Sequence, residues 1–243
     1  ILVYSTKVPI ALTKRTVHME LHYLPSLEYM ALLVGADTLS VPAYDRFGKR
    51  SYRIRTVILG ANNAITLSIP VHGANKGLLT SEMRIDNQQS WQRNHWRSIC
   101  SAYGKTPYFE YYAPDLKQFY QQAYTLLPEL TEALLRTCLD LCGLDLTICH
   151  INKEELDSLT GLNDRHNQLK PSKPWQGRDI YHPARYVQPF GDNFMPNLSV
   201  LDLLFNEGPN SRSVLIKSRQ TLEKKPSECK PDGTAKASFG CSI

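Results

Sequence analysis

The sequence lacks any apolar run near the length of about 20 residues that a membrane-spanning helix needs. The stretch from Met30 to Val34 is among its longest apolar runs. The first residues also lack a basic segment followed by an apolar core, so we expect neither a signal peptide nor a transmembrane segment. These absences favour a cytoplasmic protein.

Several enzyme signatures are missing as well. The chain contains no Walker A, G-x-G-x-x-G, G-x-S-x-G or H-E-x-x-H pattern, which removes the common nucleotide-binding and hydrolase motifs. Its six cysteines include no Cys-x-x-Cys pair, so a structural zinc site is not expected and reduced cysteines are the favoured interpretation. We predict no cofactor and no metal ion.

An excess of positive charge is absent from most of the chain. The 28 basic and 23 acidic residues give a net charge of +5, but residues 212–243 hold seven basic and three acidic residues, or +4. Residues 1–211 therefore carry only +1, which argues against a specific nucleic-acid partner. We expect a basic, disordered tail at 212–243, where apolar residues are sparse.

The remaining pattern alternates strands and helices. Polar–apolar alternation or short apolar runs predict strands at 17–23, 38–44, 52–59, 65–71 and 147–151. Helical periodicity and end signals predict helices at 27–34, 88–102, 114–127, 129–141 and 198–205, with Pro114 at a first helical position. Asn152 with Glu155, and Ser199 with Asp202, have capping-box spacing. The order predicts an α/β fold, a single domain over residues 1–211 with a mixed sheet flanked by helices.

The first predicted strand carries His18, Glu20 and His22 on one face. Imidazole and carboxylate ligands in this arrangement could hold zinc or iron, and the alternative is a solvent-facing polar row. His22 and Tyr23 stand at a strand-to-helix turn. Ligands of open α/β sheets bind beyond the carboxyl ends of strands, so both residues are candidates for a binding pocket.

A basic segment follows the second predicted strand, with cationic side chains at Arg46, Lys49, Arg50, Arg53 and Arg55. Arginine guanidinium groups bind phosphate or carboxylate oxygens in a bidentate manner. The segment therefore predicts a site for a diphosphate, such as that of a nucleotide-sugar, and the alternative is a solvated strand face.

One histidine lies on a mostly apolar helix face, where His95 falls between Trp91 and Trp96. Burial between the two indoles would lower its pKa and suit a general base, whereas a core histidine without chemistry is the alternative. A nucleophilic pair of His95 with Cys100 on this helix is disfavoured, because side chains five residues apart point about 140° from each other.

Several of these segments, in this order and spacing, resemble the WbqC-like family of bacterial proteins. The segments are His22–Pro25, Ala36–Asp37, Arg50–Arg55, Leu67–Val71, Ile85–Asp86, Trp91–Trp96 and Pro196–Gly208. The resemblance covers about residues 17–210 and leaves the basic tail outside. It implies a part in surface-polysaccharide (O-antigen) biosynthesis, and acyl or aminoacyl (glycyl) transfer to an amino sugar.

We therefore expect a transferase that acts on a small-molecule substrate, an activated or nucleotide-linked amino sugar. The expected catalytic residues are His95 as the base, with Tyr23 and Asp37. The expected substrate-binding residues are Arg50, Arg53, Arg55 and His22. The alternatives are a non-catalytic binding or assembly protein of the same machinery, and a papain-like cysteine enzyme. The sequence predicts no oligomeric state.

Overall fold

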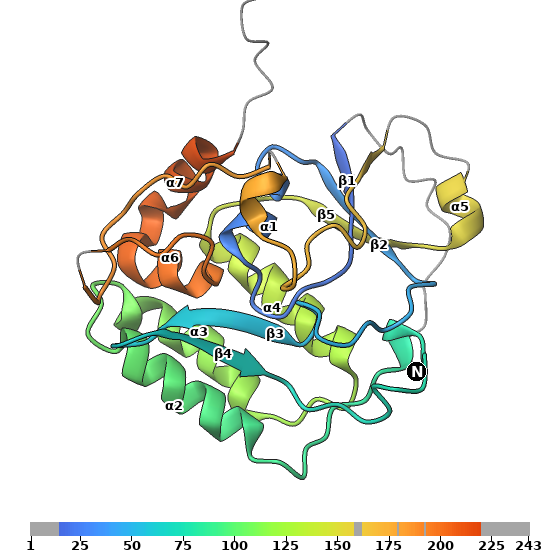
Figure 1. Cartoon of the computed structure of the whole chain (residues 1–243), viewed down its shortest axis with the longest axis horizontal. Coiled ribbons are helices and arrows are strands. Elements are labelled where there is room, and N and C mark those ends of the chain that lie inside the picture. The colour runs from blue at the N-terminus through green and yellow to red at the C-terminus, as the bar shows by residue number, and fades with distance from the viewer. Residues whose placement is uncertain (1–14, 158–161, 179, 192, 220–243) are drawn as a thin grey trace, which may run out of the picture.

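The computed structural model describes residues 15–157, 162–178, 180–191 and 193–219 (Figure 1). Within them, a parallel sheet has the strand order β5-β2-β1-β6. Its strands are β1 (Thr16–His18), β2 (Thr38–Pro42), β5 (Thr147–Ile151) and β6 (Asn163–Asp164). The strands β3 (Arg55–Leu59) and β4 (Ala64–Ser68) form a separate antiparallel hairpin. The predicted α/β fold is confirmed. Its parallel and antiparallel strand pairs lie in two sheets, whereas the prediction placed them in one mixed sheet.

The first unit is β1–α1–β2, in which helix α1 (Leu27–Leu33) connects two parallel strands. The side chain of Ser26 caps the helix by accepting the Tyr29 N–H, and Gly35 follows it at φ 77°. A Cβ at Gly35 would lie 2.6 Å from Arg219 Nη1, the end of a flexible side chain that can shift, so the turn needs glycine chiefly for its positive φ.

β1 differs from its prediction as a half-buried strand. Every residue from 17 to 23 is buried, because β1 lies inside the sheet between β2 and β6 and central parallel strands are covered on both faces. Beyond His18 the backbone pairs at intervals: the Met19 N–H donates to Ser40 O and the Tyr23 N–H donates to Tyr52 O.

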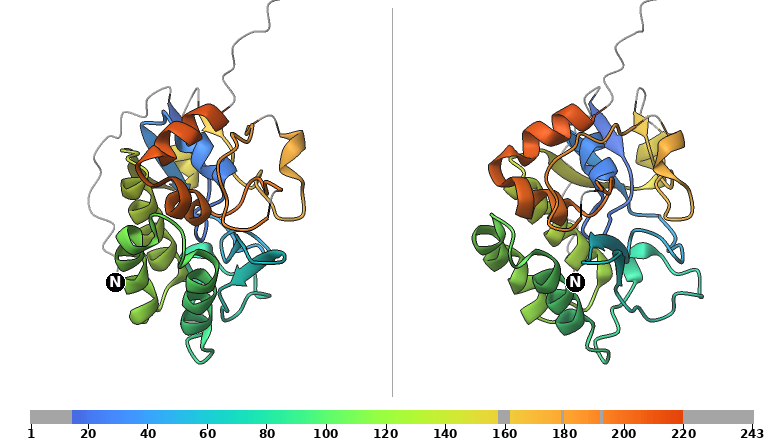
Figure 2. Two further views of the ribbon diagram at one scale, coloured as in Figure 1. Left: turned by 90° about the vertical axis from the view of Figure 1, so that its left-hand side faces the viewer. Right: turned by 60° about the vertical axis from the view of Figure 1, so that its left-hand side comes forward.

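The residues between β2 and β5 form the hairpin and the long helices. These helices are α2 (Trp91–Tyr103), α3 (Phe109–Gln121) and α4 (Leu127–Leu141). Figure 2 shows α2, α3 and the hairpin together at one end of the molecule, away from the parallel strands. Pro114 lies inside α3, not at its first position as predicted. It is tolerated there because Pro114 and Glu110, whose carbonyl loses its N–H partner, are both exposed to water.

The predicted capping box at Asn152 and Glu155 is confirmed, because each side chain accepts the other's backbone N–H at 2.8 Å. It opens the short helix α5 (Lys153–Asp157). The predicted box of Ser199 and Asp202 is wrong on the Asp202 side. The Ser199 N–H donates to Val57 O, and the Asp202 carboxylate instead accepts from Tyr186 and Gln188.

The chain continues through α6 (Val200–Glu207) into α7 (Ser211–Ser218), and both helices pack against α1. Val214 and Leu215 are buried at this contact. The first part of the segment expected to be a tail is therefore folded, because α7 supplies apolar side chains to the core. The rest of that segment, from residue 220, lies outside the described residues.

Candidate functional site

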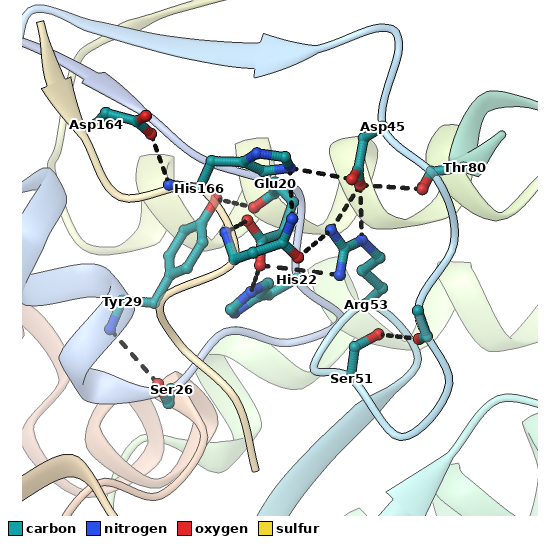
Figure 3. A network of polar contacts seen from close by, with 12 residues as sticks. Glu20, His22, Ser26, Tyr29, Asp45, Ser51, Arg53, Thr80, Asp164 and His166 are labelled. Carbon is teal, nitrogen blue, oxygen red and sulfur yellow. Dashed lines mark hydrogen bonds and ion pairs between the residues drawn. The ribbon is translucent and has the colours of Figure 1, made fainter. Parts of the chain in front are cut away.

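A cluster of polar side chains gathers where the parallel strands end (Figure 3). Glu20 follows β1, Asp45 follows β2, and His166 and Asn167 follow β6. Since the strands are parallel, their carboxyl ends share one edge of the sheet, where ligands of open α/β folds bind. Arg53, from the segment before β3, joins the cluster.

Arg53 is the centre of this cluster, and it is only 2% exposed. Its Nε and Nη2 donate to Asp45 Oδ2 at 2.9 and 2.6 Å, and Nη2 also donates to Asn167 Oδ1 at 3.0 Å. Glu20 Oε1 lies 3.8 Å from Nη1. Two carboxylates therefore compensate this buried guanidinium, as a buried charge requires.

Asp45 connects Arg53 to His166. Thr80 Oγ1 donates to Asp45 Oδ2 at 3.1 Å, while His166 Nε2 lies 3.0 Å from Oδ1. Burial would raise the pKa of Asp45, but the hydrogen bond from His166 and the adjacent Arg53 lower it. The same hydrogen bond raises the pKa of His166. The imidazole is 20% exposed, so it reaches solvent beside the cluster.

Glu20 is held from three sides. The Asn167 N–H donates to Oε2 at 2.8 Å, and His22 Nε2 lies 3.5 Å from Oε1. Burial would raise the pKa of Glu20, but its contacts with His22, Arg53 and Asn167 lower it to about 2. Burial lowers the pKa of His22, so its ring is neutral near pH 7.

His18, Glu20 and His22 are 0%, 3% and 1% exposed, so the solvent-facing polar row is wrong. His18 has a different partner from the other two: it contacts Ser40 Oγ, whereas His22 contacts Glu20. Among the described residues, no group of three histidine, cysteine or acidic side chains could hold a metal ion. The trio therefore does not form the metal site that its spacing suggested.

A basic groove lies beside the cluster, with a volume of about 430 Å³. Its lining includes Lys49, Arg50, Arg53, Arg55 and Lys170, and no acidic residue of the described chain. The structure thus brings the three predicted substrate-binding arginines to one groove. Hydrogen bonding of Ser51 Oγ to Gly48 O, at 2.8 Å, closes the turn that presents one wall.

The cationic side chains of the groove differ in whether a carboxylate neutralises them. Arg53 is neutralised by Asp45, but Lys49, Arg50, Arg55 and Lys170 form no ion pair within the described part of the chain. The Nε of Arg55 is buried without a hydrogen-bond partner there. Unsatisfied buried donors are uncommon because each costs about 1–3 kcal/mol, so a ligand oxygen at this position would be stabilised.

The structure also brings together two predicted catalytic residues, in a different place. Tyr23 Oη lies 2.9 Å from His95 Nδ1 and 2.8 Å from Tyr120 Oη. Burial lowers the pKa of His95 to about 4 and raises that of Tyr23 well above its usual value. Neither Tyr23 nor His95 lines the basic groove. Tyr23 is fully buried and His95 is 6% exposed.

Asp37 and His22 belong neither to the lining of the basic groove nor to the Tyr23–His95 pair. Asp37 precedes β2, at the amino edge of the parallel sheet and opposite to Asp45, and its carboxylate pairs with Arg15. His22 is buried against the rings of Tyr29 and Tyr52 and does not line the groove. The predicted roles of these two residues in substrate chemistry stay predictions.

The described cysteines lack the features of a nucleophile. Burial raises the pKa of Cys138 to about 12, and burial also raises the pKa of Cys100, Cys142 and Cys149. A reactive cysteine needs a lowered pKa, so these four thiols do not support a papain-like enzyme.

Sequence reasoning missed Asp45, His166, Asn167 and Lys170. Asp45 stands at the start of the basic segment, and the others lie in the polar stretch after β5. Their one signal was that long polar segments within a compact domain are often functional. Nothing local in the sequence pairs position 45 with position 166.

Fold and site together define an α/β protein with a buried charge cluster and a basic groove at the carboxyl edge of a parallel sheet. The chain belongs to the WbqC-like protein family, whose model matches residues 21–181.

The comparison with curated proteins gives a bacterial relative from Mycobacterium tuberculosis (strain ATCC 25618 / H37Rv), named "Uncharacterized protein Rv1507c". It is 23% identical over 235 residues, which cover 85% of this chain and 100% of the relative. No solved structure matches the chain significantly. In the described residues, no helix combines the length and apolar character needed to cross a membrane.

Proposed function

We propose that the protein is a transferase of surface-polysaccharide biosynthesis that binds a nucleotide-linked amino sugar and transfers an acyl or aminoacyl group to it. The resemblance to the WbqC-like family implies the pathway and the group. The basic groove supports the phosphate-bearing substrate. The single observation that carries the proposal is the set of four groove cations without acidic partners (Lys49, Arg50, Arg55 and Lys170).

The arrangement of charge fits a diphosphate. Arg50 and Arg55 offer planar guanidinium groups that can donate two hydrogen bonds to one phosphate, and Lys49 and Lys170 add point charges. Arg53 is already bound to Asp45, so in this proposal it shapes the wall between groove and cluster. A volume of about 430 Å³ accommodates a diphosphate with part of a sugar.

One observation favours a second function, a non-catalytic binding protein of the same machinery. The described residues that line the groove include no histidine, cysteine or carboxylate. A bound substrate would therefore need a base from outside the lining, and without one the groove would only hold its ligand.

Calorimetric titration with pyrophosphate and with UDP-N-acetylglucosamine tests the anion site. We expect both to bind, with affinity falling as salt rises, and Arg55→Met to weaken binding about 10- to 100-fold, since a hydrogen bond to a charged group contributes about 1.5–3 kcal/mol. Arg212→Met, at an exposed arginine on α7, is the matched control and should bind normally. Absence of pyrophosphate binding at millimolar concentration would remove the proposal.

Transfer itself is tested by mass spectrometry after incubation with a UDP-linked amino sugar and a glycyl thioester. A glycylated sugar product supports the transferase. Binding of the nucleotide-sugar without product supports the binding protein.

A further inference from the structure

The side chain of His166 lies next to the basic groove without lining it. Asn167 Nδ2 is 3.0 Å from His166 Nε2, and Asn167 is itself part of the groove wall and accepts a hydrogen bond from Arg53. One side chain therefore separates the imidazole from the groove. The ring meets this groove-wall side chain through Nε2, so a sugar attached to phosphates bound in the groove would have to extend past Asn167 to reach Nδ1.

Asp45 determines which nitrogen of His166 is available. Asp45 Oδ1 and Asn167 Nδ2 both lie 3.0 Å from Nε2, but a carboxylate only accepts and an amide NH₂ only donates, so Nε2 can hydrogen-bond with only one of them. The charge of Asp45 favours the form in which Nε2 carries the proton and donates to the carboxylate, leaving the Asn167 amide in contact without a hydrogen bond to the ring. In the neutral ring the lone pair is then on Nδ1. The other oxygen of Asp45 is occupied by Arg53 and Thr80, which fixes the carboxylate in place. A carboxylate that orients a histidine in this way is the usual support of a general base.

The surroundings of the ring favour a base that works near neutral pH. The groups that face it are Asp45, Asp164, Glu20, Arg53, His18 and Tyr44. The hydrogen bond that His166 donates to Asp45 raises the pKa of His166, against a lowering by burial. Burial lowers the pKa of His18, and that of His95 to about 4. His166 thus combines partial exposure with a carboxylate partner that belongs to the Arg53 cluster. His150, on β5, is also partly exposed, but its carboxylate partner is Glu132, outside this cluster.

We propose that His166, oriented by Asp45, is the catalytic base that deprotonates the amine of the sugar substrate. The inference rests on the proposed function and names the base that the groove lining lacks. The neutral amine nitrogen forms a bond to the acyl carbon of an activated thioester or ester. The bond from that carbon to sulfur or oxygen breaks, Nδ1 accepts the amine proton, and the imidazolium returns it to the leaving group.

A purely structural role for the pair would look different. Asp45 and His166 also connect the segment after β2 to the segment after β6, and such a contact needs only a hydrogen bond. Replacing His166 by Gln preserves a donor to Asp45 but removes the base. A structural contact predicts little effect of this change on transfer, whereas a base predicts a large one.

The first experiment measures the tautomer and pKa of every histidine by ¹⁵N NMR, with His166→Gln used for assignment. We expect the Nε2–H tautomer and a pKa of His166 above 6.5 that falls in Asp45→Asn. Saturating pyrophosphate should raise this pKa further and leave exposed His72 unchanged. A neutral Nδ1–H tautomer overturns the inference, and so does bound pyrophosphate without any effect on His166.

The second experiment compares transfer and binding. We expect His166→Gln to lose about 100-fold or more of the transfer rate, with pyrophosphate affinity within twofold of the wild type. His72→Gln, at an exposed histidine, is the control and should keep full activity. Normal transfer by His166→Gln overturns the inference and leaves the proposed function standing. If the wild type fails to bind pyrophosphate, the proposed function is wrong, and the assignment of His166 as the base for its substrate is wrong with it. The NMR measurement of the tautomer then still tests whether His166 donates to Asp45.

Discussion

The ion pair of Glu28 with Arg178 tests how the polar stretch between β6 and α6, which contains Arg178, is attached to the rest of the fold. The Nε and Nη2 of Arg178 donate to the two carboxylate oxygens of Glu28, both at 2.6 Å. The Glu28 side chain is fully buried and that of Arg178 is 12% exposed. Removing the arginine alone leaves a buried carboxylate that, among the described side chains, still accepts a hydrogen bond from the Asn197 amide, at 3.3 Å.

Arg178→Met should therefore lower the free energy of unfolding by about 3–5 kcal/mol, the usual cost of breaking a buried ion pair from one side. For a domain of this size, each kcal/mol shifts Tm by about 2–4 °C, so we expect a decrease of roughly 6–20 °C. Urea denaturation followed by circular dichroism measures the change.

The double variant Glu28→Gln with Arg178→Met is the control. It removes the buried charge together with its partner, so it should recover a large part of the lost stability. Arg136→Met, which breaks a surface pair with Glu132, should cost at most about 1 kcal/mol. A loss below 1 kcal/mol in Arg178→Met, or a double variant less stable than the single one, would refute the reasoning.

Three further predictions concern stability. The pKa of Glu20 is about 2 in the fold against 4.5 unperturbed, so its contribution is fully present above pH 4.5 and is lost as pH falls towards 2. This contribution amounts to at most about 3 kcal/mol. In Glu20→Gln the urea midpoint should therefore depend less on pH between pH 5 and 3 than in the wild type; an unchanged pH dependence would contradict this. Tyr23→Phe should cost about 1–3 kcal/mol because His95 Nδ1 loses its buried partner, whereas Tyr111→Phe, at a residue 76% exposed, should be neutral in the same titration. Leu215→Ala should cost about 2–5 kcal/mol and its exposed neighbour Ile216→Ala little; equal effects would mean that α7 does not pack as described.

Local pattern predicted much of the fold. The strand 147–151, the helix beginning at Leu27 and the capping box at Asn152 follow from side-chain periodicity and from hydrogen bonds between near neighbours. Pro114 was misplaced because a proline suits both a helix start and an exposed position inside the first turns, and only the tertiary structure decides between them.

The site was predictable only where it is local. Arg50, Arg53 and Arg55 are close in sequence, and the groove contains all three. Asp45 and His166 are 121 positions apart, and the two-residue strand β6 that brings them together has no detectable periodicity. Tyr23 and His95 are candidates by residue type, and the structure brings them together as a buried hydrogen-bonded pair. Their catalytic role stays a prediction, because a structural pair and a catalytic pair use the same residue types.

The central position of β1 has a consequence for the order in which the chain is made. Its partner β2 emerges from the ribosome about 20 residues later, but its other partner, β6, is synthesised some 145 residues after it. Until then Glu20 lacks the backbone N–H of Asn167, and Asp45 lacks the ring of His166. The nascent protein can form its first βαβ unit early, but the cluster at the carboxyl edge is completed only after residue 167 of this 243-residue sequence, just over two thirds of the way along it, has been translated. Variants that weaken the contact between β1 and β6 should therefore leave the first βαβ unit intact and affect the cluster at the carboxyl edge.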